Sequence, residues 1–151
     1  MRKVSTADWP CNIARGADLL GDHWNLLIIR EACLGTRRFD GFRRVLGIST
    51  NMLTIRLDRL VDEDVLERVA YQDRPVRHEY RLTDKGRDAY TVLAAIDAWG
   101  RRWLAGPEGS PVTLRHTACD HDMHAVVVCS ECAEPLDVRE VTTRPTRPSS
   151  A

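Results

Sequence analysis

Residues 39–82 constrain the fold most strongly, because a short helix, a tight turn and a capped helix precede two strand-like runs there. Apolar residues recur at spacings of three and four over residues 39–46, which predicts a helix that Gly47 ends. Ser49 is a favourable N-cap for a second helix over residues 50–62, in which leucines recur on one face. Two helices joined by so short a turn predict a helix-turn-helix.

The two strand-like runs cover residues 66–71 and 78–82, and the sequence QDRPVR joins them. Pro75 suits the tip of a hairpin, since a proline inside a strand removes a ladder hydrogen bond. Asp64 lies where the preceding helix needs a residue in the left-handed conformation, which Asp tolerates better than most residues. A β-hairpin directly after a helix-turn-helix is a wing, so the region predicts a winged helix-turn-helix.

Further helices are predicted on both sides of this region. Residues 11–20 have helical periodicity, and Asp22 can cap a second helix that carries Trp24 on its apolar face. After the hairpin, Thr83 can cap a long helix over residues 84–104. The predicted fold class is therefore mainly α with a small β-wing, a winged helix-turn-helix.

The sequence AGPEGSP is typical of a linker, and the composition changes there. Residues 1–106 are expected to form the winged helix-turn-helix domain, and residues 112–141 a short, β-rich, zinc-ribbon-like appendix. Residues 142–151 are rich in Pro and Ser and are predicted to be a disordered tail. At 151 residues, the chain is long enough for one domain and a small appendix.

The net charge of zero conceals an uneven distribution of charge. Up to Gly106 there are 18 Lys and Arg against 15 Asp and Glu, and from Pro107 onward there are 4 against 7. Between Arg37 and Arg59, six Arg stand against two Asp. Association with DNA depends on a local basic surface rather than on the chain average. For any single Arg, the alternative is a solvated or ion-paired side chain.

The side of the second helix opposite its leucines is predicted to face DNA. On it, Asn51 can pair with adenine N6 and N7, and Ile55 can contact a thymine methyl group. Ser49 and Thr50 at the helix N-terminus can bind a phosphate, and arginines around the turn and at the hairpin tip suit the DNA backbone. The predicted DNA-binding residues are Arg37, Arg38, Arg43, Arg44, Ser49, Thr50, Asn51, Met52, Ile55, Arg56, Arg59, Arg74 and Arg77.

The sequence also predicts the compartment and excludes some functions. No apolar run is long enough to cross a membrane, and the start MRKVSTADWP lacks the apolar stretch of a signal peptide. A cytoplasmic, nucleoid-associated protein without a membrane partner is therefore expected. Disulfides are rare in that compartment, so clustered cysteines indicate metal ligands or redox groups. The sequence contains no nucleophile–base pair or phosphate-binding loop, so we do not expect an enzyme.

Three of the five cysteines and three of the five histidines lie in the stretch RHTACDHDMHAVVVCSECAEPLD. His116 and Cys119, and then Cys129 and Cys132, are each separated by two residues, which lets one short turn direct both side chains at one ion. Two such pairs make a tetrahedral site that suits structural Zn²⁺. A metal would supply the stability that this apolar-poor appendix lacks.

Strands predicted over residues 124–128 and 136–138 complete a zinc-ribbon-like layout. Asp120 and Ala133, however, occupy the positions after the last ligand of each pair, where such a turn usually carries Gly. His121 and His124 are alternative ligands. The alternative to a metal site is a set of free thiols docked on a dimer.

Several short motifs from Cys11 to Trp103 occur together in one known family. They are GDHW and LLIIRE in the second helix, GTRRF before the third, IS…ML…RL..L in the fourth, RHEYRLTDKG in the wing and AWG..W in the last helix. In this combination the chain resembles the HxlR family of bacterial winged helix-turn-helix transcription regulators. Two departures are Asp64, where the family usually has Gly, and GDHW in place of the usual GGKW.

The resemblance implies a homodimeric regulator that presents two recognition helices to an inverted-repeat operator in double-stranded DNA. Members of the family dimerise through their first and last helices and often respond to small molecules or electrophiles, which implies a small-molecule effector of unknown identity. In the last helix, an apolar stripe recurs at spacings of four, three and four residues. This predicted dimer interface, whose alternative is intramolecular core, consists of Val92, Ile96, Trp99 and Trp103.

Cys11 matches the cysteine that serves as a redox sensor in some members of the family. It lies near a helix start, where a thiolate is favoured, and the alternative is a structural thiol at the dimer interface. Cys33, next to Leu34, is expected to be a buried, apolar-type residue.

A function of another class competes with transcription regulation. In that alternative, the zinc ribbon is a protein- or RNA-interaction module and the winged helix is a dimer scaffold. Specific operator binding should weaken steeply as the salt concentration rises, which separates the two functions.

Overall fold

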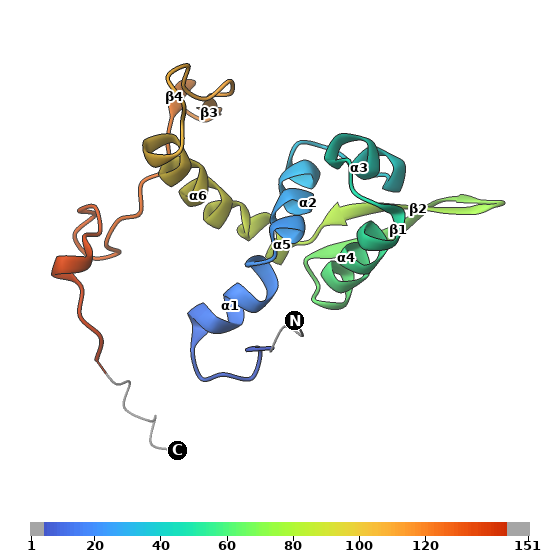
Figure 1. Ribbon diagram of the computed structural model, residues 1–151, viewed down its shortest axis with the longest axis horizontal. Helices are drawn as coiled ribbons and strands as arrows, with labels where there is room; N and C mark the ends of the chain where they lie inside the picture. Colours follow the sequence, from blue (N-terminus) through green and yellow to red (C-terminus); the bar gives the residue numbers. More distant parts are fainter. Residues whose placement is uncertain (1–4, 145–151) are drawn as a thin grey trace. The chain divides into compact units, whose positions relative to one another are not determined.

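The computed structural model describes residues 5–144, so the first four residues and most of the predicted tail lie outside the described residues. The chain forms two compact units, one ending at Leu93 and the other beginning at Ala94, whereas the sequence predicts a boundary in the linker. The elements, labelled in Figure 1, are α1 (Asn12–Leu20), α2 (His23–Cys33), α3 (Phe39–Leu46), α4 (Thr50–Asp62), β1 (Leu66–Asp73), β2 (Val76–Leu82), α5 (Asp84–Asp88), α6 (Tyr90–Trp103), β3 (Leu114–His116), β4 (His121–Met123) and the 3-10 helix η1 (Val138–Glu140).

The core of the first unit lies where α2, α3 and α4 pack together and against the base of the wing. Phe42 of α3 is fully buried, and its ring meets that of Tyr80 edge-on, with ring centres 6.4 Å apart. The leucines of α4, Leu53, Leu57 and Leu60, are fully buried, as their spacing predicts.

Local sequence features determine where α3 ends and α4 begins, as predicted. Gly47 adopts a left-handed conformation at φ 62° and donates its N–H to the Arg43 carbonyl at 3.0 Å, which ends α3. Ser49 caps α4, since its Oγ accepts the N–H of Met52 at 3.3 Å. The turn between α3 and α4 therefore consists of residues 47–49.

The wing is longer than the sequence predicts. Its two antiparallel strands pair from Leu66–Leu82 out to Asp73–Val76, so that only Arg74 and Pro75 remain at the tip. The polar residues near the tip have low strand propensity, but the cross-strand ladder decides their conformation.

The chain before α3 is joined to the wing by backbone contacts. The N–H of Tyr80 donates to the Arg37 carbonyl at 2.7 Å, and Arg38 forms a β-bridge with Glu79. These contacts therefore hold the start of α3 against the wing.

The predicted helix over residues 84–104 consists of two helices that meet at Ala89. Thr83 caps α5 as predicted, accepting the N–H of Gly86 at 3.1 Å, while its hydroxyl donates to the Asp64 carbonyl at 2.6 Å. Asp64 has φ 55°, so it adopts the left-handed conformation expected of it. These contacts press α5 against the turn between α4 and β1.

The two strands predicted in the appendix form only in part, as an isolated β-bridge between Val128 and Pro135. The sequence predicts strands over residues 124–128 and 136–138, but β4 precedes the first of these, and η1 overlaps the second. The reason is local, because β3 pairs with β4 and the turn between them closes a hairpin before residue 124. No residue from 105 to 144 is buried, so this part of the second unit has no apolar core. Among the described residues, no helix has the length and apolar character needed to span a bilayer.

Candidate nucleic-acid interface and neighbouring sites

The exposed side of α4 begins at its N-terminus. Ser49, Thr50 and Asn51 are exposed there, and Ile55, one turn further on, is 50% exposed. A capped helix N-terminus with hydroxyl groups can bind a phosphate, while Asn and an apolar side chain can contact base edges. This face therefore has the residue types that a recognition helix needs.

Exposed arginines accompany this face. The guanidinium of Arg38 lies 4.6 Å from the centre of the Tyr71 ring, a cation–π contact that links the start of α3 to the wing. Arg43 lies 3.8 Å from Asp40, and both side chains are more than half exposed, so solvent screens the pair and leaves Arg43 able to bind phosphate. The wing projects past α3 and α4 (Figure 1). The predicted arginines outside α4 are all exposed: Arg37, Arg38, Arg43, Arg44, Arg74 and Arg77.

Two predicted DNA contacts, Arg56 and Arg59, are instead held by carboxylates of the same unit. Arg59 donates to a side-chain oxygen and to the carbonyl of Asp18, at 2.7 and 3.0 Å, and Arg56 lies 3.0 Å from Asp22. Their side chains are only 29% and 20% exposed. The prediction that Arg59 points outward is wrong, because its side of α4 faces α1. A helical wheel drawn for α4 alone does not take that neighbouring helix into account. Both residues attach α4 to the preceding helices.

The rest of the exposed face also differs from the prediction at two positions. Met52, predicted to point outward, is half-buried and packs against the core. Thr54, which is not among the predicted contacts, is exposed, and its hydroxyl donates to the Thr50 carbonyl at 3.0 Å. On a helical wheel Thr54 lies about 60° from Asn51, so the periodicity contained the signal for it.

The apolar stripe of α6 is exposed along its length. Val92, Ile96, Trp99 and Trp103 are 42%, 47%, 57% and 62% exposed. None of the four side chains is therefore buried within its own unit. Contiguous apolar side chains on a surface mark an interaction site.

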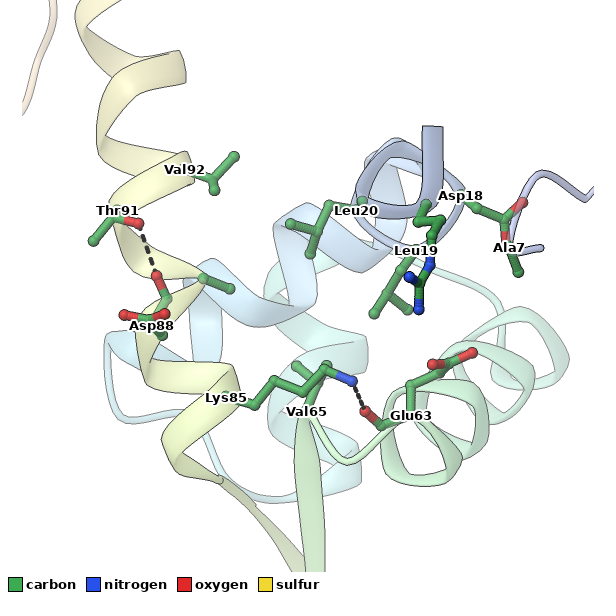
Figure 2. Close-up of a pocket in the computed structure, with 13 residues that line it drawn as sticks. Ala7, Asp18, Leu19, Leu20, Glu63, Val65, Lys85, Asp88, Thr91 and Val92 are labelled. Carbon is green, nitrogen blue, oxygen red and sulfur yellow. Dashed lines mark hydrogen bonds between the residues drawn. The ribbon is translucent and has the colours of Figure 1, made fainter. Parts of the chain in front are cut away.

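A pocket of 390 Å³ lies in the first unit, between α1, α5 and the first turn of α6 (Figure 2). Lys85 reaches across it and donates to the Glu63 carbonyl at 2.5 Å, and the Thr91 hydroxyl donates to the Asp88 carbonyl at 2.9 Å. Apolar side chains with a few charged groups are typical of small-ligand sites. Val92 belongs to both the pocket lining and the stripe of α6.

Two cysteines of the first unit differ in environment. Cys11 is exposed at the N-cap of α1, where its side chain makes no capping hydrogen bond. Cys33 packs against the core, and burial raises the pKa of its thiol above the usual value. A raised pKa leaves little thiolate, so Cys33 has the character of a buried, apolar-type residue.

The predicted metal ligands form two pairs. The Nδ1 of His116 lies 3.3 Å from the Sγ of Cys119. The sulfur of Cys129 accepts the backbone N–H groups of Cys132 and Glu131 and a hydrogen bond from the Cys132 side chain, which together hold the pKa of its thiol below the usual value. In the described part of the chain, however, no three His, Cys, Asp or Glu side chains come together as a metal-binding group. The four predicted ligands therefore form two separate pairs in the described structure.

Comparison with known proteins agrees with the geometry of the first unit. Residues 19–107 match the family described as HxlR-like helix-turn-helix. The chain is similar to the uncharacterized HTH-type transcriptional regulator Rv3095 of Mycobacterium tuberculosis (strain ATCC 25618 / H37Rv). The two are 41% identical over 134 residues, which cover 89% of this chain and 85% of the relative.

Solved structures fall into two groups by how much of the chain they cover. The crystal structure of PA1607, described as a candidate transcription factor, is similar with a TM-score of 0.82 and 34% identity, covering 96% of this chain and 100% of that chain. The redox regulator HypR in its oxidized form has a TM-score of 0.56 and 29% identity, covering 61% of this chain and 96% of that chain. The reduced form of the transcriptional regulator YodB from B. subtilis has a TM-score of 0.55 and 34% identity, covering 62% and 93%.

Proposed function

The chain belongs to the HxlR-like helix-turn-helix family of transcription regulators, and we propose that it acts as a homodimer on an inverted-repeat operator. The observation that carries this proposal is the exposed N-terminal face of α4, with arginines on α3 and on the wing beside it. The relatives are regulators rather than enzymes, and the chain is accordingly a transcription regulator and not an enzyme.

In the proposed complex, different parts of the surface contact different parts of the DNA. The N-terminal turn of α4 enters the major groove, where Asn51 and Ile55 contact base edges. Ser49 and Thr50 bind the phosphate nearest the helix N-terminus. The arginines of α3 and the wing neutralise phosphates, which positions the protein but specifies no bases.

The homodimer is supported by the exposed stripe of α6. The two tryptophans at its end offer a large apolar area, and burying such area is the main driving force for stable association. The pocket adjoins this stripe through Val92, so a small-molecule effector bound there would contact the proposed dimer surface. This arrangement supports a coupling between effector binding and the spacing of the two recognition helices.

Asn51→Ala is expected to relax base preference, whereas Arg74→Ala is expected to weaken binding to all sequences alike. Loss of a bidentate contact to adenine should reduce discrimination at that base pair by about 1–3 kcal/mol. Loss of a phosphate contact should instead reduce the salt dependence of binding by about one unit of slope. Both can be measured by titrating the dimer with operator and scrambled duplexes at several salt concentrations.

The spacing of the half-sites provides one further readout. Half-sites about one helical turn apart should bind more tightly than half-sites set half a turn out of phase, because the two recognition helices share one face of DNA. If Asn51→Ala retains full discrimination, the proposed orientation of α4 is wrong.

Oxidation of Cys11 is expected to release the operator. Cys11 is exposed at a helix start, and the structural neighbours HypR and YodB are regulators solved in oxidized and reduced forms respectively. Treatment with the thiol oxidant diamide should lower operator affinity at least tenfold in the wild type and leave Cys11→Ser unaffected. Cys33→Ser is the matched control, and it should respond to diamide like the wild type. An equal response of Cys11→Ser and wild type would contradict a sensor role.

A further inference from the structure

We propose that the segment after residue 112 binds one structural Zn²⁺ per chain, which joins two half-sites that the backbone has already formed. The four ligands are His116, Cys119, Cys129 and Cys132.

The two half-sites have the same backbone turn. In each, the residue after the second ligand donates its N–H to the carbonyl of the first ligand: Asp120 to His116 at 2.8 Å, and Ala133 to Cys129 at 2.9 Å. Asp120 and Ala133 have φ values of 59° and 60°, in the left-handed region that the glycine of a zinc-binding turn occupies. The turn is thus present twice without its usual glycine.

Residue propensity does not account for this repetition. The sequences HTACD and CSECA share only their second ligand, and Ala disfavours the left-handed conformation. What the two turns have in common is a pair of metal-binding side chains two residues apart. The shared geometry is that of a turn which presents two ligands to one ion.

Each turn also closes a β-hairpin. His116 pairs with His121 across β3 and β4. In the second half-site, the Cys129 N–H donates to the Glu134 carbonyl at 2.9 Å, and the next pair outward, Val128 and Pro135, forms a β-bridge. Two hairpins, each with a ligand pair at its turn, are the layout of a zinc ribbon.

The distances select His116 from the three histidines of the segment. Bond lengths of about 2.3 Å to sulfur and 2.0–2.1 Å to nitrogen place the two ligand atoms of a tetrahedral site about 3.6 Å apart. The 3.3 Å between His116 Nδ1 and Cys119 Sγ is close to that value. The Nδ1 of His121 lies instead 2.6 Å from the Cys119 carbonyl, and His124 lies beyond the hairpin.

A bound ion would supply the stability that this segment lacks for want of an apolar core. No side chain between residues 105 and 144 is buried, and apolar residues such as Val126, Val127 and Leu136 are about half exposed. Residues 124–126, between the two hairpins, belong to neither a helix nor a strand, so drawing the half-sites together need not break either hairpin. With four protein ligands the ion has no open position, which makes its role structural.

The test is metal analysis of the full-length protein, purified without a histidine tag. We expect one Zn²⁺ per chain in the wild type and none in Cys129→Ser or Cys119→Ser. Cys11→Ser, which removes an exposed cysteine of the first unit, is the matched control and should keep its zinc. Replacement of zinc by Co²⁺ should produce the thiolate charge-transfer band and the visible bands of a tetrahedral site, and Cys129→Ser should abolish them.

Folding of the two units provides a separate readout. In Cys129→Ser, limited proteolysis should cut the segment after residue 112 quickly, while thermal unfolding of the winged helix should be unchanged. His116→Ala should lose zinc and His121→Ala should keep it. The proposal is overturned by a zinc content near zero with Cys119, Cys129 and Cys132 alkylated as fast as Cys11, by zinc retained in Cys129→Ser, or by zinc lost in His121→Ala but kept in His116→Ala.

Discussion

Replacing Trp99 and Trp103 together by Asp is expected to convert the protein to monomers and to abolish operator binding at concentrations that saturate the wild type. The two side chains are 57% and 62% exposed in the single chain, so the substitutions should not disturb its own core. In the proposed dimer they would place charges in an apolar interface and also remove buried apolar area. A loss of at least about 4 kcal/mol, or about a thousandfold in dimer affinity, follows. Sedimentation velocity across a concentration series measures it.

A variant with the same added charge at other exposed apolar residues serves as the control. Leu34 and Val45 are 74% and 53% exposed and lie at the end of α2 and on α3. Leu34→Asp with Val45→Asp should remain dimeric. A Trp99→Asp and Trp103→Asp protein that sediments as a dimer would show that the stripe of α6 is not the interface.

Gly86→Ala is expected to destabilise the winged helix severely. A Cβ at this position would lie 2.1 Å from the Val65 carbonyl oxygen and 3.0 Å from a methyl carbon of Leu82. The carbonyl belongs to the backbone that links α4 to β1, so it cannot move aside as a side chain could. We expect a loss of about 3 kcal/mol in the free energy of unfolding and a fall of about 10–20 °C in Tm, measured by circular dichroism.

Gly16→Ala on α1 is the matched control for that substitution. A Cβ at Gly16 would meet no atom within 4 Å beyond its chain neighbours and the backbone of its own helix, so the change should be neutral or should stabilise α1 by up to about 1 kcal/mol. Equal Tm values for Gly86→Ala and Gly16→Ala would mean that α5 does not press on the α4–β1 turn as described.

Much of the winged helix could be predicted from the sequence because its signals are local. The caps at Ser49 and Thr83 and the left-handed conformations of Gly47 and Asp64 depend on residues nearby in the sequence, and the leucines of α4 recur at helical spacing. Each such signal is a hydrogen bond or a steric preference that the local chain satisfies alone. The positions of the helices and of the wing therefore follow from short stretches of sequence.

The extent of the candidate site depended on contacts between distant residues. Arg59 pairs with Asp18, 41 positions earlier, and no periodicity within α4 indicates that pairing. Gly86 must be Gly because a backbone carbonyl from another element approaches it, which no property of α5 indicates. The exposure of the α6 stripe likewise became visible only in the structure. In a sequence, an apolar helix face looks the same whether it packs against its own core or against a second molecule. Sequence patterns report preferences along the chain, whereas charge pairing, close approach and exposure arise between elements that folding brings together.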